Sequence, residues 1–317
     1  MLKKFLDNLS VVILAGVLFL IFNAFSFTSA NELTFAQISD AHYSPDKNNT
    51  SYRLNAESAK LLEDAISQVN ETPSINFVIF TGDMINKSRK DDLFQFIEIA
   101  NKLNKPWYAV FGNHDINIGG YLTKSKYSEI LAEKNPTLKE IQKPYYSFSP
   151  KKGFKAIILD TIIDTRITAN GEIDSEQLKW LDKELEKSKK DVVLIFTHVP
   201  IVEPFSSSGH KLLNDDKVLA VLEKYKNPIA VFSGHYHTTK IIPKDNLLFV
   251  STPSLVSYPN AFRIIKVTNN RNYVVFDIKF KETNLKDIQQ IAKMMVFSKD
   301  LYYGKENDRN FTYKIQK

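Results

Sequence analysis

Five of the six histidines lie in short motifs that also carry aspartate, asparagine or glycine. Each motif follows a run of apolar residues, so its polar side chains stand at the end of a predicted strand. Open α/β sheets hold their ligands at such strand ends. The motifs are Asp40-Ala-His42, Gly82-Asp83, Gly112-Asn113-His114-Asp115, Thr197-His198 and Gly234-His235-Tyr236-His237. The sequence therefore predicts that these side chains form one polar site.

This set of residue types suits a centre of two divalent metal ions. Two ions about 3.5–4 Å apart can clamp a phosphate ester and activate a water between them. Such a centre needs a shared carboxylate, neutral nitrogen ligands and a group that protonates the leaving oxygen. Asp40 and His42 are two residues apart, as are His235 and His237, so in an extended strand each pair would point to one side. The chain has no cysteine, and nitrogen and oxygen ligands without sulfur suit Mn, Fe, Zn, Co or Ni.

Residues 1–30 have the layout of a secretory signal peptide. Lys3 and Lys4 precede an apolar run over residues 11–22, and small residues end the segment at Ala30. The run is short for a membrane span, which favours cleavage over retention as an uncleaved N-terminal anchor. Either reading predicts an exported catalytic domain, periplasmic or extracellular. Contact with a membrane is expected only through this segment, if it is not cleaved.

The composition is that of a globular protein, with 43% hydrophobic and 25% charged residues. The formal charge is +6, and residues 1–30 contribute +1 of it through Lys3, Lys4 and Asp7, which leaves +5. No basic stripe with interleaved aromatic residues is present, so nucleic acid is not an expected partner. We expect one domain over residues 31–283, followed by a helix and tail over residues 284–317.

Apolar runs alternate with amphipathic helices in the first part of the domain. The predicted strands and helices of this βαβ succession are 33–39, 54–69, 77–81, 91–103 and 107–111. Residues 116–154 read as an insertion over the site. Further buried strands are predicted at 155–159, 192–196 and 229–232, and Asp174, with Gln177 three residues on, predicts a helix start with a capping box. Alternating strands follow at 239–242, 247–251, 262–268 and 273–280. The pattern predicts an α/β sandwich of two sheets with helices on its outer faces.

The ordered motif set resembles that of the calcineurin-like metallophosphoesterase superfamily, over residues 35 to about 255. Three segments are most similar to the motifs of one branch, the class III cyclic-nucleotide phosphodiesterases. They are Gln37-Ile-Ser-Asp-Ala-His, Phe80-Thr-Gly-Asp and Phe232-Ser-Gly-His-Tyr-His. The resemblance implies a four-layer αββα sandwich of two mixed sheets. That branch often forms homodimers, so a homodimer is a further expectation.

The resemblance also implies a role for each motif residue. Asp40, His42 and His237 would hold the first metal, and Asp83 would bridge. Asn113, His198 and His235 would hold the second metal. His114 would bind the scissile phosphate and act as general acid, with Asp115 orienting it. The implied function is an exported phosphoesterase that hydrolyses phosphodiester or phosphomonoester bonds of a small-molecule substrate by attack of a metal-bridged hydroxide.

Two other functions fit the same residues. The site could act on an envelope phospholipid or a nucleotide-sugar pyrophosphate, which the predicted export favours. A non-catalytic metal- or phosphate-binding module is the other alternative, but it would have no need for a general acid at His114. His210 lies outside the motifs in a Ser-rich loop; it could reach a substrate phosphate, although a surface position is the expected one.

Overall fold

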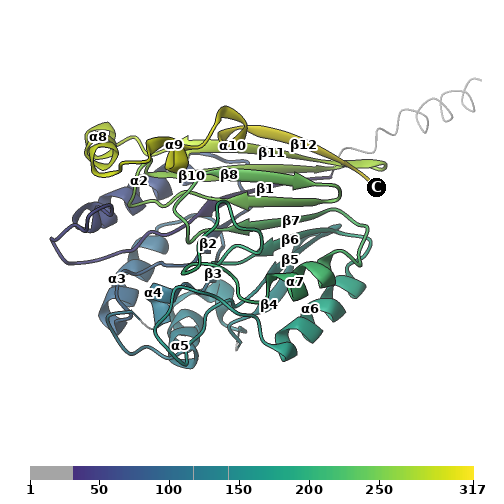
Figure 1. Cartoon of the computed structure of the whole chain (residues 1–317), viewed down its shortest axis with the longest axis horizontal. Coiled ribbons are helices and arrows are strands. Elements are labelled where there is room, and N and C mark those ends of the chain that lie inside the picture. The colour runs from purple at the N-terminus through teal and green to yellow at the C-terminus, as the bar shows by residue number, and fades with distance from the viewer. Residues whose placement is uncertain (1–30, 117, 142) are drawn as a thin grey trace, which may run out of the picture. The chain divides into compact units, whose positions relative to one another are not determined.

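Two six-stranded sheets lie face to face in the computed structural model, which describes residues 31–116, 118–141 and 143–317 (Figure 1). Residues Glu32–Lys317 form one compact unit. The predicted signal peptide lies outside the described residues. Within them, no helix has the length and apolar character that crossing a membrane requires.

The first sheet has the strand order β12-β11-β10-β1-β2-β3. Its parallel half confirms the predicted βαβ succession, because β1 pairs with β2 and β2 with β3 in parallel. The other half is antiparallel. Its outer strand, β12, lies near the C-terminus and was not predicted. The strands are β1 (Asn31–Ile38), β2 (Phe77–Thr81), β3 (Trp107–Val110), β10 (Ala261–Asn269), β11 (Tyr273–Glu282) and β12 (Phe311–Gln316).

The second sheet has the order β4-β5-β6-β7-β9-β8, with four parallel strands between two antiparallel edges. Its strands are β4 (Tyr146–Lys151), β5 (Phe154–Ile158), β6 (Val192–Phe196), β7 (Ile229–Ser233), β8 (Lys240–Lys244) and β9 (Leu247–Ser251). The segment predicted as an insertion therefore supplies an edge strand of this sheet, β4. Because a parallel strand is buried on both faces, β6 and β7 read as continuous apolar runs.

Aromatic side chains fill the space between the two sheets. The Phe35 ring of the first sheet packs on Phe77 at 5.1 Å, and on Phe196 and Phe232 of the second sheet at 5.5 and 5.1 Å between ring centroids. All four side chains are buried. This core fixes the two sheets against each other, which brings the strand ends of both to one edge.

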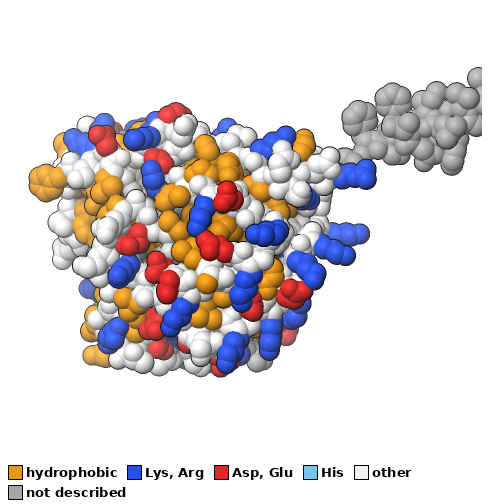
Figure 2. Space-filling view, turned by 45° about the vertical axis from the view of Figure 1, so that its right-hand side comes forward, with side chains coloured by type: hydrophobic (Ala, Val, Ile, Leu, Met, Phe, Trp, Pro, Cys, Tyr) orange, Lys and Arg blue, Asp and Glu red, His pale blue; other side chains and the backbone are white. Residues whose placement is uncertain are grey.

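Helices cover the outer faces of the sandwich and complete its four layers (Figure 1). The fold therefore confirms the predicted two-sheet architecture. The helices of these layers are α2 (Ser58–Asn70), α3 (Lys90–Ala100), α5 (Lys124–Lys134), α6 (Ser175–Lys187) and α7 (Asp215–Leu222). Short elements η1 (Asn55–Glu57), α4 (Asn113–Ile116) and η2 (Pro136–Leu138) join them. On the face in Figure 2, basic and acidic side chains are interspersed.

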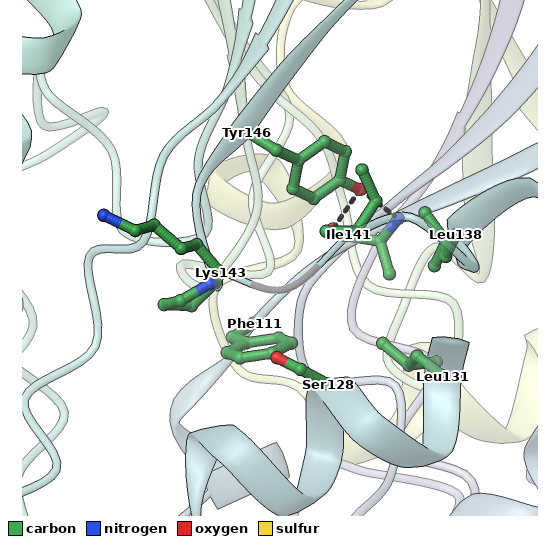
Figure 3. Close-up of a pocket in the computed structure, with 9 residues that line it drawn as sticks. Phe111, Ser128, Leu131, Leu138, Ile141, Lys143 and Tyr146 are labelled. Atoms are coloured by element: carbon green, nitrogen blue, oxygen red, sulfur yellow. Dashed lines mark hydrogen bonds between the residues drawn. The ribbon is translucent and has the colours of Figure 1, made fainter. Parts of the chain in front are cut away.

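A small apolar pocket lies between α5 and the sheets (Figure 3). The Tyr146 hydroxyl closes it by donating to the Ala109 carbonyl at 2.9 Å. Phe111, Leu131 and Leu138 line it. Its volume is about 10 Å³, no more than the space for a single water. This pocket is part of the packing of the insertion and is too small for a substrate.

The C-terminal segment forms α8 (Lys286–Met295), α9 (Lys299–Tyr303) and α10 (Glu306–Arg309) before β12. Arg263 of β10 is fully buried and holds this segment. Its guanidinium donates to the carbonyls of Ser251, Asp308 and Arg309 at 3.1, 2.8 and 3.1 Å. The segment predicted as a helix and tail is therefore tied into the first sheet.

Candidate metal centre

The five motifs meet where strands of both sheets end. β1, β2 and β3 of the first sheet end just before three of them, and β6 and β7 of the second sheet end before the other two. Side chains from these turns form three groups whose nitrogen and oxygen atoms lie within 4.8 Å of one another. The groups are Asp40, His42 and His237; His42, Asp83 and His114; and Asp83, His198 and His235. The structure thus brings together the predicted site residues.

Asp83 lies between the two outer groups. Its Oδ2 is 3.5 Å from the Nε2 of His42 on one side and 3.5 Å from the Nε2 of His198 on the other. The other carboxylate oxygen, Oδ1, accepts from the backbone N–H of His114 at 2.8 Å. The side chain is buried. One carboxylate thus faces both ligand groups, the arrangement that a shared ligand of two ions requires.

The first ligand group joins the turns after β1 and β7. The Nε2 atoms of His42 and His237 are 3.2 Å apart, and His237 Nε2 is 3.3 Å from Asp40 Oδ1. Asp40 is held by its neighbours, because its Oδ2 accepts from Ser39 Oγ at 2.6 Å and from the His235 N–H at 3.0 Å. Oδ1 also accepts from the His235 N–H, at 3.2 Å, and is the oxygen directed at the imidazole of His237.

The second ligand group joins the turns after β3, β6 and β7. His198 Nδ1 donates to the Thr81 carbonyl at 2.9 Å, which leaves Nε2 without its proton when the ring is neutral. This Nε2 lies 3.1 Å from Asn113 Oδ1 and 3.1 Å from His235 Nδ1. A second hydrogen bond of this kind orients a metal-binding imidazole.

Five of the predicted ligands have a left-handed backbone. The φ angles are 52° at Asp40, 39° at His42, 49° at Asp83, 71° at His235 and 54° at His237. Non-glycine residues are uncommon there, and such strain concentrates at functional sites. The predicted extended geometry of the His-x-His and Asp-x-His pairs is therefore wrong. β1 ends at Ile38 and β7 at Ser233, so the ligands lie on turns beyond the strands.

Two glycines permit the close approach of these turns. Gly82 has φ of 88°, and a Cβ there would lie 2.3 Å from His198 Nδ1. A Cβ at Gly234 would lie 1.9 Å from Ser39 Oγ and 2.5 Å from Asp40 Oδ2. Any larger residue at either position would displace a predicted ligand or the group that holds it.

His114 is oriented by a backbone carbonyl. Its Nδ1 donates to the Asn86 carbonyl at 2.7 Å, so Nε2 faces the site. The Asp115 carboxylate instead accepts from the N–H groups of Gly112 and Ile85 at 2.8 and 3.1 Å. Asp115 therefore supports the turn that carries His114, so the predicted orienting effect on the ring would act through the backbone.

The charges of the centre shift several pKa values. Burial lowers the pKa of His42, and the Arg53 guanidinium adds to this effect. Burial also tends to lower the pKa of His198, but the Asp83 carboxylate outweighs it and raises that pKa to about 9. Burial and the charge of Asp83 raise the pKa of Asp115 to about 7. The carboxylate shared by the two ligand groups is thus also the strongest attraction for positive charge at His198.

Arg53 is a site residue that the sequence reasoning missed. Its Nη1 lies 3.1 Å from His42 Nδ1 and 3.2 Å from His114 Nε2. Its Nε is buried and has no hydrogen-bond partner among the described residues. The residue lies in the loop between the first motif and η1, where a basic side chain is usually solvated, so the sequence carried no signal for it.

A pocket of about 270 Å³ opens beside the centre. Its walls are largely aromatic and include the predicted ligands His235 and His237. His210 is exposed, as expected, yet its ring lies 5.4 Å from that of His235 and borders the pocket. The lining residues are Tyr52, Phe205, Ser207, His210, His235, Tyr236, His237 and Tyr302. Tyr302 belongs to α9, and no sequence motif marks it.

The donor set fits two first-row divalent ions. It combines imidazole nitrogens, carboxylates and the amide oxygen of Asn113, with no sulfur. His235 turns its Nδ1 toward this set, 3.1 Å from the Nε2 of His198. The identity of the ions is not encoded in this donor set, because Mn, Fe, Zn, Co and Ni all accept it.

The chain is similar to several known proteins. The family model of calcineurin-like phosphoesterases matches residues 33–239, which include every predicted site residue. A manganese-dependent ADP-ribose/CDP-alcohol diphosphatase of Oryza sativa is 26% identical over 255 residues, covering 64% of this chain and 77% of that protein. A probable glycerophosphodiester phosphodiesterase of Arcobacter nitrofigilis is 27% identical, covering 69% and 77%. A probable cyclic nucleotide phosphodiesterase of Colwellia psychrerythraea is 26% identical, covering 65% and 71%.

Among solved structures, a dimetal phosphatase from Danio rerio superposes with a TM-score of 0.61 at 19% sequence identity. The match covers 79% of this chain and 96% of that one. At this identity the match shows a common fold, the two-sheet sandwich with outer helices.

Proposed function

The chain belongs to the calcineurin-like phosphoesterase family and is a phosphoester hydrolase, and within that class we propose that it is an exported, dinuclear-metal-dependent phosphodiesterase. The position of Asp83 is the observation that supports a centre of two metal ions. Its Oδ2 is equally distant, at 3.5 Å, from His42 of one ligand group and His198 of the other. One ion would be held by Asp40, His42 and His237, the other by Asn113, His198 and His235, and both by Asp83.

Bound at these residues, two ions would supply an activated water and stabilise the charge that develops on the phosphate. The chain's own contribution begins with the orientation of its ligands. Thr81 fixes the tautomer of His198, and Ser257 Oγ lies 3.1 Å from Nδ1 of His237. Held in this way, the Nε2 atoms of both rings point at the centre.

We assign the protonation of the leaving oxygen to His114. Its Nδ1 is committed to the Asn86 carbonyl, and its Nε2 faces the centre 3.2 Å from Arg53. Because Nδ1 already carries a proton, a proton on Nε2 requires the imidazolium form of the ring, and this is the proton that an oxygen leaving the phosphorus would receive. Burial lowers the pKa of His114, so the negative charge of a bound phosphate would be needed to favour that form. The Arg53 guanidinium only donates hydrogen bonds, so a phosphate oxygen is the acceptor that suits it at this position.

A diester substrate is supported by the aromatic pocket beside the centre. A phosphate monoester carries one organic group, whereas a diester carries two and needs room for both. The pocket of about 270 Å³ adjoins His235 and His237 and gives one of these groups a place next to the ions. The named activities of two of the relatives, glycerophosphodiester and cyclic-nucleotide hydrolysis, also concern diesters.

The proposal is tested with bis-p-nitrophenyl phosphate after metal removal and re-addition of Mn, Fe, Zn, Co or Ni. We expect activity to return with one or more of these metals and to exceed that on p-nitrophenyl phosphate. Activity on the monoester alone would remove the diesterase assignment. Bound metal without turnover on either ester, on cyclic AMP or on a UDP-sugar would instead indicate a binding module.

Export is tested separately. It is supported by the basic residues, apolar run and small residues of the sequence before Asn31. We expect the protein made from its full gene to be recovered outside the cytoplasm, with Asn31 or a nearby residue at its N-terminus. Recovery of the full-length chain in the cytoplasm would contradict this part of the proposal.

A further inference from the structure

His210 borders the pocket beside the metal centre, on the loop between β6 and α7. Its ring lies 5.4 Å from the ring of His235, a predicted ligand, and 6.2 Å from the ring of Tyr236. It belongs to none of the five motifs, and protonation of the leaving oxygen is already assigned to His114. Because the side chain is exposed, a group that extends from the ions past His235 can reach it.

The loop that carries His210 is anchored to the turn after β7. Tyr236, which stands between two of the predicted ligands in the chain, donates from its hydroxyl to Glu203 Oε1 at 2.5 Å. The same carboxylate oxygen accepts from the N–H of Ser207 at 3.0 Å. The Phe205 ring packs edge-on against Tyr236, with 4.9 Å between ring centroids. These contacts fix the first part of the loop relative to the metal centre.

The second part of the loop and the imidazole itself are held as well. Asn170 donates from Nδ2 to the Ser208 carbonyl at 3.2 Å, and its Oδ1 accepts from the Lys211 N–H at 2.9 Å. Ser207 Oγ lies 3.1 Å from His210 Nδ1, within hydrogen-bond distance. When this hydroxyl donates to Nδ1, the neutral ring carries its proton on Nε2 and can donate it to a ligand.

The pocket combines aromatic walls with hydrogen-bonding side chains. Tyr52, Phe205 and Tyr302 provide rings that a flat or apolar surface can pack against. Ser207 and His210 provide groups that can donate to an oxygen. None of the described residues that line the pocket is a lysine, an arginine, an aspartate or a glutamate. An uncharged organic group with oxygen atoms therefore suits the pocket, whereas a second phosphate would be buried there without a cationic partner.

The proposed general acid lies outside this pocket. His114 and Arg53 are not among the residues that line it. The His114 ring packs 4.6 Å from His42 of the first ligand group, whereas the His210 ring lies beside His235 of the second. Since the leaving oxygen takes its proton from His114, the leaving group lies on that side of the phosphate. The organic group in the pocket is then the one that stays bonded to phosphorus.

We propose that His210 is a specificity residue, which donates from Nε2 to an oxygen of the ester group that the phosphate retains. The substrates are phosphodiesters whose retained group is an uncharged alcohol with further oxygen atoms. Water adds its oxygen to phosphorus, the bond from phosphorus to the other ester oxygen breaks, and that oxygen leaves with a proton as the free alcohol. The product in the pocket is the phosphate monoester of the retained alcohol. This assignment rests on the proposed phosphodiesterase function.

The test compares two diesters that release the same alcohol, p-nitrophenol, and differ only in the retained group: methyl p-nitrophenyl phosphate and thymidine 5′-(p-nitrophenyl phosphate). We expect the metal-loaded wild type to favour the thymidine ester. His210→Ala should lower the ratio of kcat/KM for the thymidine ester to that for the methyl ester by about three- to tenfold, chiefly through KM. His210→Asn, which keeps an N–H donor, should restore part of this ratio. Lys211→Ala, an exposed position on the same loop outside the pocket, should leave the ratio at the wild-type value.

Calorimetric titration with thymidine 5′-phosphate, the expected product, gives a second readout that needs no turnover. We expect His210→Ala to weaken this binding by a similar factor and Lys211→Ala to leave it unchanged. An unchanged kcat/KM ratio in His210→Ala, or release of thymidine and p-nitrophenyl phosphate from the thymidine ester, would overturn the assignment. Binding of thymidine 5′-phosphate that depends on His210, with no turnover of either ester, would refute the phosphodiesterase function and leave the role of His210 in the pocket standing.

Discussion

The imidazoles of His42 and His237 face each other through Nε2 atoms 3.2 Å apart, from turns that are 195 residues apart in the chain. Both rings are buried, and Asp40 and Asp83 approach the same pair. At this distance two neutral rings can share one proton at most, whereas a divalent ion would bind both lone pairs. The fold therefore brings together donors that an ion satisfies better than they satisfy each other.

Metal removal is expected to destabilise the protein. An ion that binds only the folded chain, present at a thousand times its Kd, raises the free energy of unfolding by about 4 kcal/mol. The melting temperature should fall when a chelator is added and recover when excess Mn or Zn is restored. An unchanged melting temperature after metal loss, verified by elemental analysis, would contradict a structural contribution of the ions.

Asp83→Asn should abolish turnover while preserving the fold. The amide has nearly the same shape as the carboxylate but lacks the negative charge that faces both ligand groups. We expect kcat on bis-p-nitrophenyl phosphate to fall at least about a hundredfold and bound metal to fall below two ions per chain. The matched control is Asp216→Asn, an exposed aspartate at the start of α7. Wild-type turnover and metal content in Asp83→Asn would refute the shared role.

Much of the sandwich could be predicted, because its central strands are buried on both faces. The runs Phe77–Phe80, Val192–Phe196 and Ile229–Phe232 are apolar throughout, and each of these predicted strands is present. β12 was missed because its alternating residues at Phe311–Gln316 become a strand only through pairing with β11. Propensity alone does not reveal such a partner.

The grouping of the motif residues was predicted, but the backbone geometry of their turns was not. The left-handed backbone at Asp40 and His237 depends on contacts with other turns, so spacing along the chain could not show it. Gln177 gives a second example. Its N–H donates to the carboxylate of Asp174, as the predicted cap requires, but its side chain bonds the backbone of Asp160 instead of returning to the cap. Arg53 and Tyr302 reach the centre from segments with no motif, and only the fold reveals them.

Arg53→Met should weaken substrate binding more than it disturbs the fold. Its guanidinium lies at His42 and His114, where it can donate to a phosphate oxygen. Loss of a charge-assisted hydrogen bond of about 1.5–3 kcal/mol predicts a fall in kcat/KM of roughly ten- to a hundredfold. Arg53→Lys should restore part of it, and Arg271→Met, in an exposed hairpin, is the control. If kcat/KM stays at the wild-type value in Arg53→Met, Arg53 does not contact the substrate.

Glu184→Gln should remove a pH-dependent part of the stability that lies far from the centre. Glu184 accepts from Ser147 Oγ at 2.7 Å and pairs with Lys155 and Lys187 at 3.1 and 2.7 Å, which ties α6 to β4 and β5. Burial alone would raise its pKa, but these donors outweigh burial and lower the pKa from 4.5 to about 2. Because the folded-state pKa is depressed, the stabilisation is complete above the unfolded value and is lost as the pH falls toward 2.

We therefore expect Glu184→Gln to lower the free energy of unfolding by about 1–2 kcal/mol near neutral pH. This value allows for the weaker ion pair with Lys187, which solvent screens. The difference from wild type should narrow as the pH falls below 4.5 and approach zero near 2. Urea denaturation of both proteins across this range measures it, and taking the difference cancels the titration of the other carboxylates. Glu186→Gln, which breaks an exposed pair with Lys189 on the same helix, should change little at any pH. A constant difference between Glu184→Gln and wild type down to the acid limit would show that packing, rather than charge, accounts for the loss.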